Sequence, residues 1–181
     1  MTTINKAGFY EHNNYGGAMS TFSLGTTVIN SFNNMNNEIS SIKVSDEGTY
    51  LAIWDTVNTV GSFYILRGPI DVPNLNVIGW NDRIRSSSLG TPPAGGVTLF
   101  ADANGLGKFA FRSTDSSDLA FQIGNDKLSS IRLFPRTLIQ IFRDINYGGP
   151  VEEHDNPSYT NSILLNVNNN DWASSIKLIY F

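Results

Sequence analysis

The chain has 181 residues, of which 40% are hydrophobic and 15% are charged, and its formal net charge is -4. This charge offers no basic surface for nucleic acid or for anionic lipid. The absence of cysteine excludes disulfides, zinc–thiolate sites and cysteine nucleophiles. The length suits one large domain or two small ones, and abundant Asn, Ser, Thr and Gly are typical of all-β chains with many turns.

The N-terminal segment does not have the pattern of a signal peptide. The first 17 residues, MTTINKAGFYEHNNYGG, lack the apolar region of a signal peptide, and no run of 18 apolar residues occurs elsewhere. We therefore expect a protein that is not in a membrane. We expect the cytoplasm or, after export without a leader, a cell surface or coat, and a leader missing from the given sequence stays open.

A hairpin signal recurs along the chain. Residues 10–17 (YEHNNYGG) and 142–149 (FRDINYGG) have an aromatic residue, four residues, a second aromatic residue, one residue and a glycine. Residues 54–61 (WDTVNTVG) and 100–107 (FADANGLG) keep the first aromatic residue and the last glycine but have Thr59 and Gly105 in the middle. Short β-prone runs flank these copies, at residues 49–54, 62–66, 97–100, 108–111 and 138–142. This arrangement predicts β-hairpins.

A second signal, which we call the anchor loop, follows each hairpin. Its copies with the strand that follows are residues 36–44 (NNEISSIKV), 81–89 (NDRIRSSSL), 125–133 (NDKLSSIRL) and 170–178 (NDWASSIKL). They begin 45, 44 and 45 residues apart, which indicates one supersecondary unit used four times. The alternation after each loop predicts a strand with one buried face. The second strand is the weakest of these predictions, because Ser87 stands where the other copies have isoleucine.

Each repeat also needs a middle strand, for which residues 118–123 (DLAFQI) and 161–165 (NSILL) are candidates. Four strands per repeat with one long connection predict a Greek key, and two facing repeats predict a sandwich. Residues 89–96 (LGTPPAGG) have the composition of a linker, with Pro92 and Pro93 holding part of it extended. We predict domains at 1–90 and 97–181, joined by a linker at 91–96.

The first six residues of each anchor loop offer only oxygen ligands. Asn or Asp at positions one and two, Ser at position five and the backbone carbonyls are the donors that Ca²⁺ prefers, and no soft ligand for zinc or copper is present. The same residue types also form Asx and Ser/Thr turns without any metal. A single loop taken alone is therefore explained better by a simple turn, and it is the repetition of the loop that favours a cation site.

In both signals the chain resembles the βγ-crystallin family. Its Greek key motif has the aromatic, four, aromatic, one, glycine pattern, and its microbial members carry the calcium signature N/D-N/D-x-x-S/T-S. Residues 36–41, 125–130 and 170–175 satisfy that signature. The resemblance covers nearly the whole chain as four motifs in two domains. It implies two Greek key sandwich domains, each of two four-stranded motifs, and a non-enzymatic calcium-binding protein with a structural or stress- or dormancy-related role.

In that family the two motifs of a domain exchange ligands across their loops. The resemblance implies two sites in the second domain, from Ala101, Asp126, Lys127 and Ser174, and from Arg143, Asp171, Trp172 and Ser129. Ala101 and Arg143 would contribute backbone carbonyls only. We expect such weakly charged sites to bind Ca²⁺ with micromolar affinity or weaker.

The first domain departs from the signature at Arg85, which occupies position five of its second loop. A guanidinium repels a divalent cation and cannot coordinate it. The resemblance therefore implies that a site built from Glu11, Asn37 and Glu38 is lost or weakened. A site built from Asp55, Asp82, Arg83 and Ser40 keeps its ligands, so we expect two or three sites in the chain.

Other polar groups carry no predicted chemistry. Glu152, Glu153, His154 and Asp155 follow the last hairpin turn, where we expect a solvated hairpin rather than a metal or acid–base site, and His12 lies in the matching turn of the first repeat. Two histidines and no cysteine leave little material for a hydrolase, so we expect no enzyme. Trp80 and Trp172 flank anchor loops, where we expect core packing, with a sugar-stacking platform as the alternative. A carbohydrate- or protein-binding module (lectin, inhibitor or toxin-like) is the alternative function, and we expect a monomer or weak homodimer.

Overall fold

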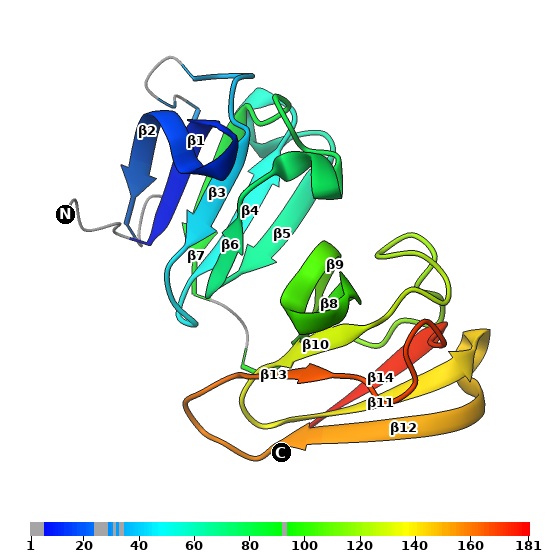
Figure 1. Ribbon diagram of the computed structural model, residues 1–181. Coiled ribbons are helices and arrows are strands. Elements are labelled where there is room, and N and C mark those ends of the chain that lie inside the picture. Colours follow the sequence, from blue (N-terminus) through cyan, green and yellow to red (C-terminus); the bar gives the residue numbers. More distant parts are fainter. Residues whose placement is uncertain (1–5, 24–28, 31, 33–34, 92–93) are drawn as a thin grey trace. The chain divides into compact units, whose positions relative to one another are not determined.

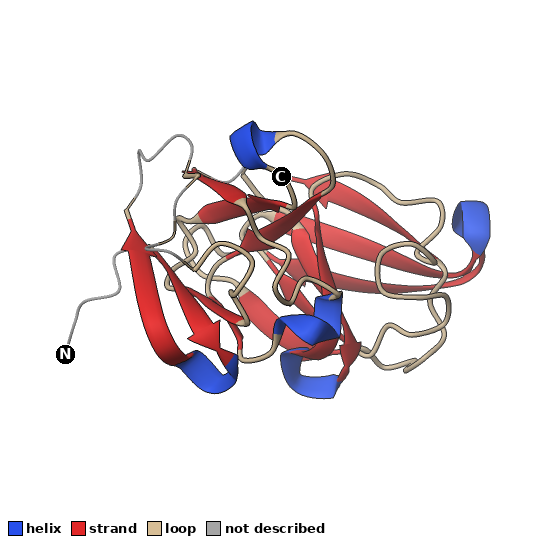
Figure 2. Cartoon of the chain, turned by 90° about the horizontal axis from the view of Figure 1, so that it is seen from above, coloured by secondary structure: helices blue, strands red, loops and turns tan. Residues whose placement is uncertain are grey.

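The computed structural model describes residues 6–23, 29–30, 32, 35–91 and 94–181, and the chain divides into two compact units, residues 1–92 and 93–181 (Figure 1). Strands and loops make up nearly all of the described part, which contains short 3-10 turns and no α-helix (Figure 2). No helix in that part has the length and apolar character needed to cross a membrane. The predicted all-β fold class is confirmed. The predicted extended Pro92–Pro93 segment lies outside the described residues, and the boundaries 1–90, 91–96 and 97–181 stay a prediction.

The first unit contains two antiparallel sheets. One has the strand order β2-β1-β3-β6 and the other has the order β5-β4-β7. The strands are β1 Ala7–His12, β2 Gly16–Phe22, β3 Ser41–Val44, β4 Tyr50–Trp54, β5 Phe63–Arg67, β6 Ile70–Val72 and β7 Ser86–Gly90. The 3-10 turns of this unit are η1 Asn13–Tyr15, η2 Val57–Thr59 and η3 Leu75–Ile78.

The second unit repeats this plan. Its sheets have the orders β13-β10-β8-β9 and β12-β11-β14. The strands are β8 Val97–Asp102, β9 Leu106–Arg112, β10 Ser130–Leu133, β11 Thr137–Asp144, β12 Gly148–Asn156, β13 Ile163–Asn166 and β14 Ser175–Tyr180, with turns η4 Ala103–Gly105 and η5 Ile145–Tyr147. The runs predicted as hairpin strands lie within β4, β5, β8, β9 and β11.

The two motifs of each unit exchange their third segments. Strand β6 pairs with β3 of the preceding motif, and β13 pairs with β10 in the same way. In the opposite direction the exchange is reduced to single bridges, between Ile29 and Ser87 and between Ser116 and Ile176. Each sheet is therefore completed by the neighbouring motif, so the motifs of a unit depend on one another.

One predicted middle strand is confirmed and one is wrong. Residues 161–165 overlap β13, whereas residues 118–123 form a turn after the Ser116 bridge. In this turn the carbonyl of Leu119 accepts N–H groups of Gln122, Ile123 and Gly124. Phe121 is 90% exposed, so the apparent alternation of the segment does not reflect a buried face.

The final glycine of each hairpin signal has a steric reason. Gly17 and Gly61 have φ of 74° and 91°, and a Cβ at either position would lie 2.7 Å from a carboxylate oxygen of Glu11 or Asp55. Gly107 and Gly149 have the same relation to Asp102 and Asp144. Glycine is therefore required both by the positive φ and by the close approach of an acidic side chain.

The inward faces of the sheets form one apolar core in each unit. In the second unit Leu99, Ile131, Ile141 and Ile176 are almost completely buried within it. The first unit has Ser87 at the position of Ile176, and this serine is also fully buried, with no hydrogen-bond partner for its hydroxyl oxygen. Strand β7 nevertheless pairs with β4 along five residues, so the strand expected to be weakest is regular.

Candidate metal-binding loops

The anchor loops of each unit are joined in pairs through their backbones. The residue at position two has a positive φ in all four loops, between 52° and 66°, and its N–H donates to the position-four carbonyl of the partner loop. The donor and acceptor pairs are Asn37 to Ile84, Asp82 to Ile39, Asp126 to Ala173 and Asp171 to Leu128. Asn and Asp tolerate this backbone region better than most residues. Their presence at position two thus has a conformational reason that needs no metal.

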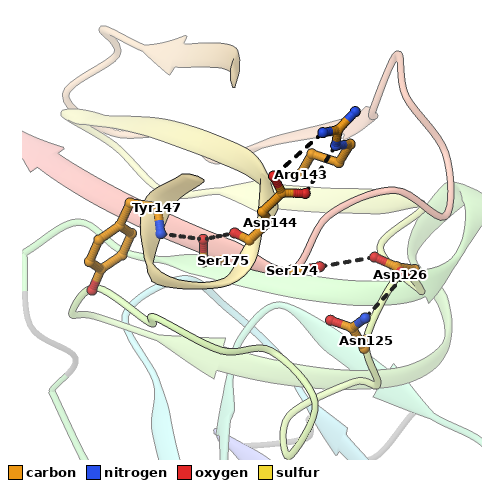
Figure 3. Close-up of polar contacts among 7 residues, drawn as sticks. All are labelled: Asn125, Asp126, Arg143, Asp144, Tyr147, Ser174 and Ser175. Carbon is orange, nitrogen blue, oxygen red and sulfur yellow. Dashed lines mark hydrogen bonds and ion pairs between the residues drawn. The ribbon is translucent and has the colours of Figure 1, made fainter. Parts of the chain in front are cut away.

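The serine at position six fixes the adjacent hairpin. Its hydroxyl donates to a hairpin carbonyl at 2.6–2.7 Å and accepts an N–H at 2.9–3.1 Å, as in the Asp144–Ser175–Tyr147 chain of Figure 3. The four serines are Ser41, Ser86, Ser130 and Ser175. Because this hydroxyl is engaged twice within the fold, the last residue of the signature has a structural role.

The serine at position five differs, because its hydroxyl meets a carboxylate of the partner loop. In the second unit Ser174 Oγ lies 2.9 Å from Asp126 Oδ1 (Figure 3), and Ser129 Oγ lies 3.2 Å from Asp171 Oδ1. Ser129 Oγ also lies 2.7 Å from the carbonyl oxygen of Ala101. Each cluster thus joins two loops and contains only oxygen donors, which is the set that a hard cation requires.

The structure groups the second unit's predicted ligands differently from the expectation. Ala101 was expected beside Asp126 and Ser174, but it lies with Ser129 and Asp171. The N–H of Ser174 donates to the carbonyl of Phe142, which places Arg143 with Ser174 and Asp126 instead. Position five is therefore tied to the hairpin of its own motif.

A cavity of about 470 Å³ opens beside the cluster of Ser174 and Asp126. Its lining contains three carboxylates, an amide, a hydroxyl and a guanidinium, together with two apolar side chains: Asn125, Asp126, Arg143, Asp144, Ile145, Asp171, Trp172 and Ser174. The Arg143 guanidinium points to the carboxylate of Asp144, with Nε 3.0 Å from Oδ1 (Figure 3). Trp172 also packs against the core of its unit, so it contributes both to the cavity wall and to the core.

The first unit has one comparable cluster. Ser40 Oγ lies 3.3 Å from Asp82 Oδ1, and the N–H of Ser40 donates to the carbonyl of Tyr10, which brings in Glu11. The Glu11 carboxylate accepts the N–H of Ala18 at 2.8 Å. The expectation that Ser40 and Asp82 lie with Asp55 is therefore corrected.

Arg85 lies at the other loop cluster of the first unit. Its N–H donates to the carbonyl of Trp54 at 2.9 Å, which places it next to Asp55. The N–H of Asn37 in the partner loop donates to the carbonyl of Ile84, next to Arg85. We infer that Asn37 and its neighbour Glu38 belong with Asp55 and Arg85, rather than with Glu11. Arg83, at position three, forms an ion pair with Asp55 at 3.2 Å.

Glu152 is a structural residue that the sequence interpretation missed. It is 7% exposed, and its carboxylate accepts the N–H groups of Asn168 and Asn169 at 2.7 and 3.0 Å and contacts His154 Nε2 at 2.5 Å. Desolvation raises the pKa of Glu152, but these hydrogen bonds outweigh it and hold the pKa below its ordinary value. The expected solvated hairpin is thus wrong for Glu152. A usable signal existed, because Glu152 pairs with Ile141, whose side chain faces the core.

Charged ligands are sparse at all these loops. Nowhere in the described ranges do three or more His, Cys, Asp or Glu residues gather as a metal-binding group. Any cation at the anchor loops would therefore depend on neutral oxygens, from hydroxyls and carbonyls, as much as on carboxylates.

No family model matches the sequence, and no curated protein matches it. Solved structures do: protein S complexed with calcium is 17% identical, with 97% of this chain and 100% of that chain covered and a TM-score of 0.55. A βγ-crystallin from an archaeon is 28% identical, covering 48% of this chain and 98% of its own, with a TM-score of 0.39. A βγ-crystallin domain from Flavobacterium johnsoniae is 26% identical, covering 46% of this chain and 93% of its own, with a TM-score of 0.38.

Proposed function

The chain has the βγ-crystallin fold, with four Greek key motifs in two units, and from this premise we propose that it is a non-enzymatic calcium-binding protein whose fold Ca²⁺ stabilises. The observation that carries the proposal is the meeting of a hydroxyl, a carboxylate and a carbonyl from two loops at Ser129, Asp171 and Ala101. The similar protein S was solved in complex with calcium, which agrees with this choice of cation.

Two sites in the second unit would follow from the observed grouping. One would use the side chains of Ser129 and Asp171 with the carbonyls of Ala101 and Trp172. The other would use Ser174 and Asp126 with the carbonyls of Arg143 and Lys127. Each set supplies four oxygens and one full negative charge, while Ca²⁺ takes six to eight oxygens, so water completes the shell. This composition favours modest affinity.

Bound Ca²⁺ would stabilise the fold because each site joins two loops that belong to different motifs. A ligand that binds only the native state contributes RT ln(1 + [Ca]/Kd), about 2.7 kcal/mol at a hundredfold excess over Kd. Stability would then follow the calcium supply. A structural role under stress or in dormancy is consistent with such a dependence and forms part of the proposal.

Thermal unfolding with Ca²⁺ and with chelator tests this function. We expect a higher midpoint with Ca²⁺ for the wild type, and loss of most of the increase in the variant Asp126→Asn with Asp171→Asn. Asp155→Asn, an exposed carboxylate far along β12 from the loops, is the matched control and keeps the full increase. Equal midpoints with and without Ca²⁺ in the wild type would defeat the proposal.

A carbohydrate-binding module is the second candidate. The cavity beside Asp126 is larger than a cation needs, and it combines carboxylates, an amide and a guanidinium with the indole of Trp172. Aromatic faces with planar polar groups suit a sugar ring, whose hydroxyls need hydrogen bonds. A glycan array with the full chain, in Ca²⁺ and in chelator, separates this candidate from a purely structural protein.

A further inference from the structure

A guanidinium joins the second hairpin of the first unit to the anchor loop that follows it. Arg83 Nη2 lies 3.2 Å from Asp55 Oδ2, and Arg83 Nη1 donates to the carbonyl of Gly79 at 2.9 Å. The guanidinium also lies over the ring of Trp80, with Cζ 5.0 Å from the ring centroid. One side chain thus connects the end of β4, the entrance of the loop and the loop itself.

The carboxylate of Asp55 is engaged on both oxygens. Its Oδ1 accepts the N–H of Ser62 at 3.0 Å, across the hairpin, while Oδ2 faces Arg83. Desolvation raises the pKa of Asp55, but the bonds from Ser62 and Arg83 outweigh it and lower the pKa below its ordinary value. Asp55 is therefore an ionised group whose two acceptor atoms already have partners.

The other three motifs cannot form this bridge. It needs opposite charges at the residue after the leading aromatic and at position three of the anchor loop. These two positions hold Glu11 with Glu38, Ala101 with Lys127, and Arg143 with Trp172. Arg143 does have a carboxylate partner, but Asp144 is its neighbour in the same hairpin, so that pair connects nothing across the fold.

We propose that Arg83 is an internal cation that takes the place of a metal ion at the Asp55 loop cluster. Because the guanidinium is covalently part of the chain, its ion pair with Asp55 opens and closes within the molecule, and the strength of this pair does not depend on calcium supply. It also withholds the Asp55 carboxylate from a diffusible cation, beside an Arg85 that already repels one. The Asp55 loop cluster of the first unit is thus joined by its own charge, while the loop clusters of the second unit rely on added Ca²⁺. This last contrast rests on the proposed function.

Hydrogen exchange of the full chain in chelator tests the internal cation without reference to calcium. In Arg83→Gln we expect amides of residues 55–62 and 79–86 to exchange about threefold faster, the size expected for an exposed ion pair. Asp55→Asn has the same effect, and the double variant adds nothing further. Arg143→Gln is the matched control and leaves both segments unchanged. Unchanged exchange in Arg83→Gln, or additive effects in the double variant, would overturn the proposal.

Calcium calorimetry tests the withholding of Asp55. We expect Arg85→Ser alone to bind no additional Ca²⁺, and Arg83→Gln with Arg85→Ser to gain a site, because only the double variant both frees the Asp55 carboxylate and removes the repelling charge of Arg85. A full extra site in Arg85→Ser alone would contradict the proposal. Should the wild type bind no Ca²⁺ at all, the proposed function fails, whereas the exchange experiment in chelator still decides whether Arg83 joins the loops.

Discussion

In both units a side-chain contact joins the second strand of a hairpin to the residue just before an anchor loop, but the chemistry of this contact differs. In the first unit Tyr64 of β5 packs against Trp80 at the entrance of an anchor loop, with ring centroids 6.2 Å apart. At the matching places in the second unit, Glu152 of β12 hydrogen-bonds Asn169, with 2.8 Å between the carboxylate and the amide nitrogen. Equivalent loops are thus held in place by an apolar contact in the first unit and by a charged one in the second. Two units with the same backbone arrangement can therefore respond differently to pH and to ions.

Among the variants that test this comparison, removal of the Glu152 carboxylate should cause the largest loss of stability. In Glu152→Ala the part-buried hydrogen bonds from the N–H groups of Asn168 and Asn169 lose their acceptor, which costs about 1–3 kcal/mol in the free energy of unfolding. Denaturant titration measures the loss. Glu153→Gln, at an exposed neighbour, is the control and changes little. Equal stability of Glu152→Ala and wild type would show that the hydrogen bonds of Glu152 do not stabilise the fold.

Acid should separate the two units. The folded pKa of Glu152 lies below its unfolded value, so its stabilising contribution is complete above the unfolded pKa and is lost as pH falls through the folded pKa. Tyr64, whose pKa burial raises, stays neutral over that whole range. We therefore expect the second unit to unfold first on acidification.

Tryptophan fluorescence on single-tryptophan variants follows each unit during this titration, from Trp80 in the first unit and Trp172 in the second. Asp46 and Asp55 also have lowered pKa values, but both are exposed enough for salt to screen their ion pairs. High salt should thus remove the part of the acid-induced loss of stability that comes from Asp46 and Asp55, and leave the part that comes from Glu152. Earlier unfolding of the first unit would contradict the comparison.

A smaller effect is expected from the core difference at Ser87. Its fully buried hydroxyl has no hydrogen-bond partner, so Ser87→Ala removes a desolvated polar group and should stabilise the first unit by about 1 kcal/mol. Thermal unfolding measures the gain. Ser88→Ala, on the opposite face of the same strand, is the control. Destabilisation by Ser87→Ala would mean that packing around the hydroxyl outweighs its desolvation.

The smallest expected change is in the separated domains. Fragments 1–90 and 97–181 should each keep the hydrogen-exchange pattern that they have in the full chain, because each sheet is completed within its own unit. Fragment 97–181 should also keep the proposed calcium sites. Sedimentation of the full chain tests the monomer or weak homodimer in the same series. An unfolded fragment would show that the two predicted domains stabilise each other.

Much of the local structure could be predicted because it depends on neighbours in sequence. Short β-prone runs identified β4, β8 and β11, alternation identified the strands after the anchor loops, and the recurring glycines identified hairpin turns that need positive φ. The strand predicted at 118–123 was wrong because alternating apolar residues also occur in a turn whose aromatic residue, Phe121, faces solvent. Glu152 was missed for the opposite reason, since a carboxylate suggested a wet face although its pairing with Ile141 predicted an inward one.

The sequence by itself determined the fourfold period, the hairpins, the oxygen-rich loops and the misplaced charge of Arg85, because turn residues, alternation and donor type are local properties. Only the tertiary structure decided which loops share a site, that third strands are exchanged, and that Arg83 reaches Asp55. Those outcomes depend on which carbonyl or carboxylate a group meets from some 28 to 48 residues away. Residue type leaves several such partners open, and packing of the two motifs selects one.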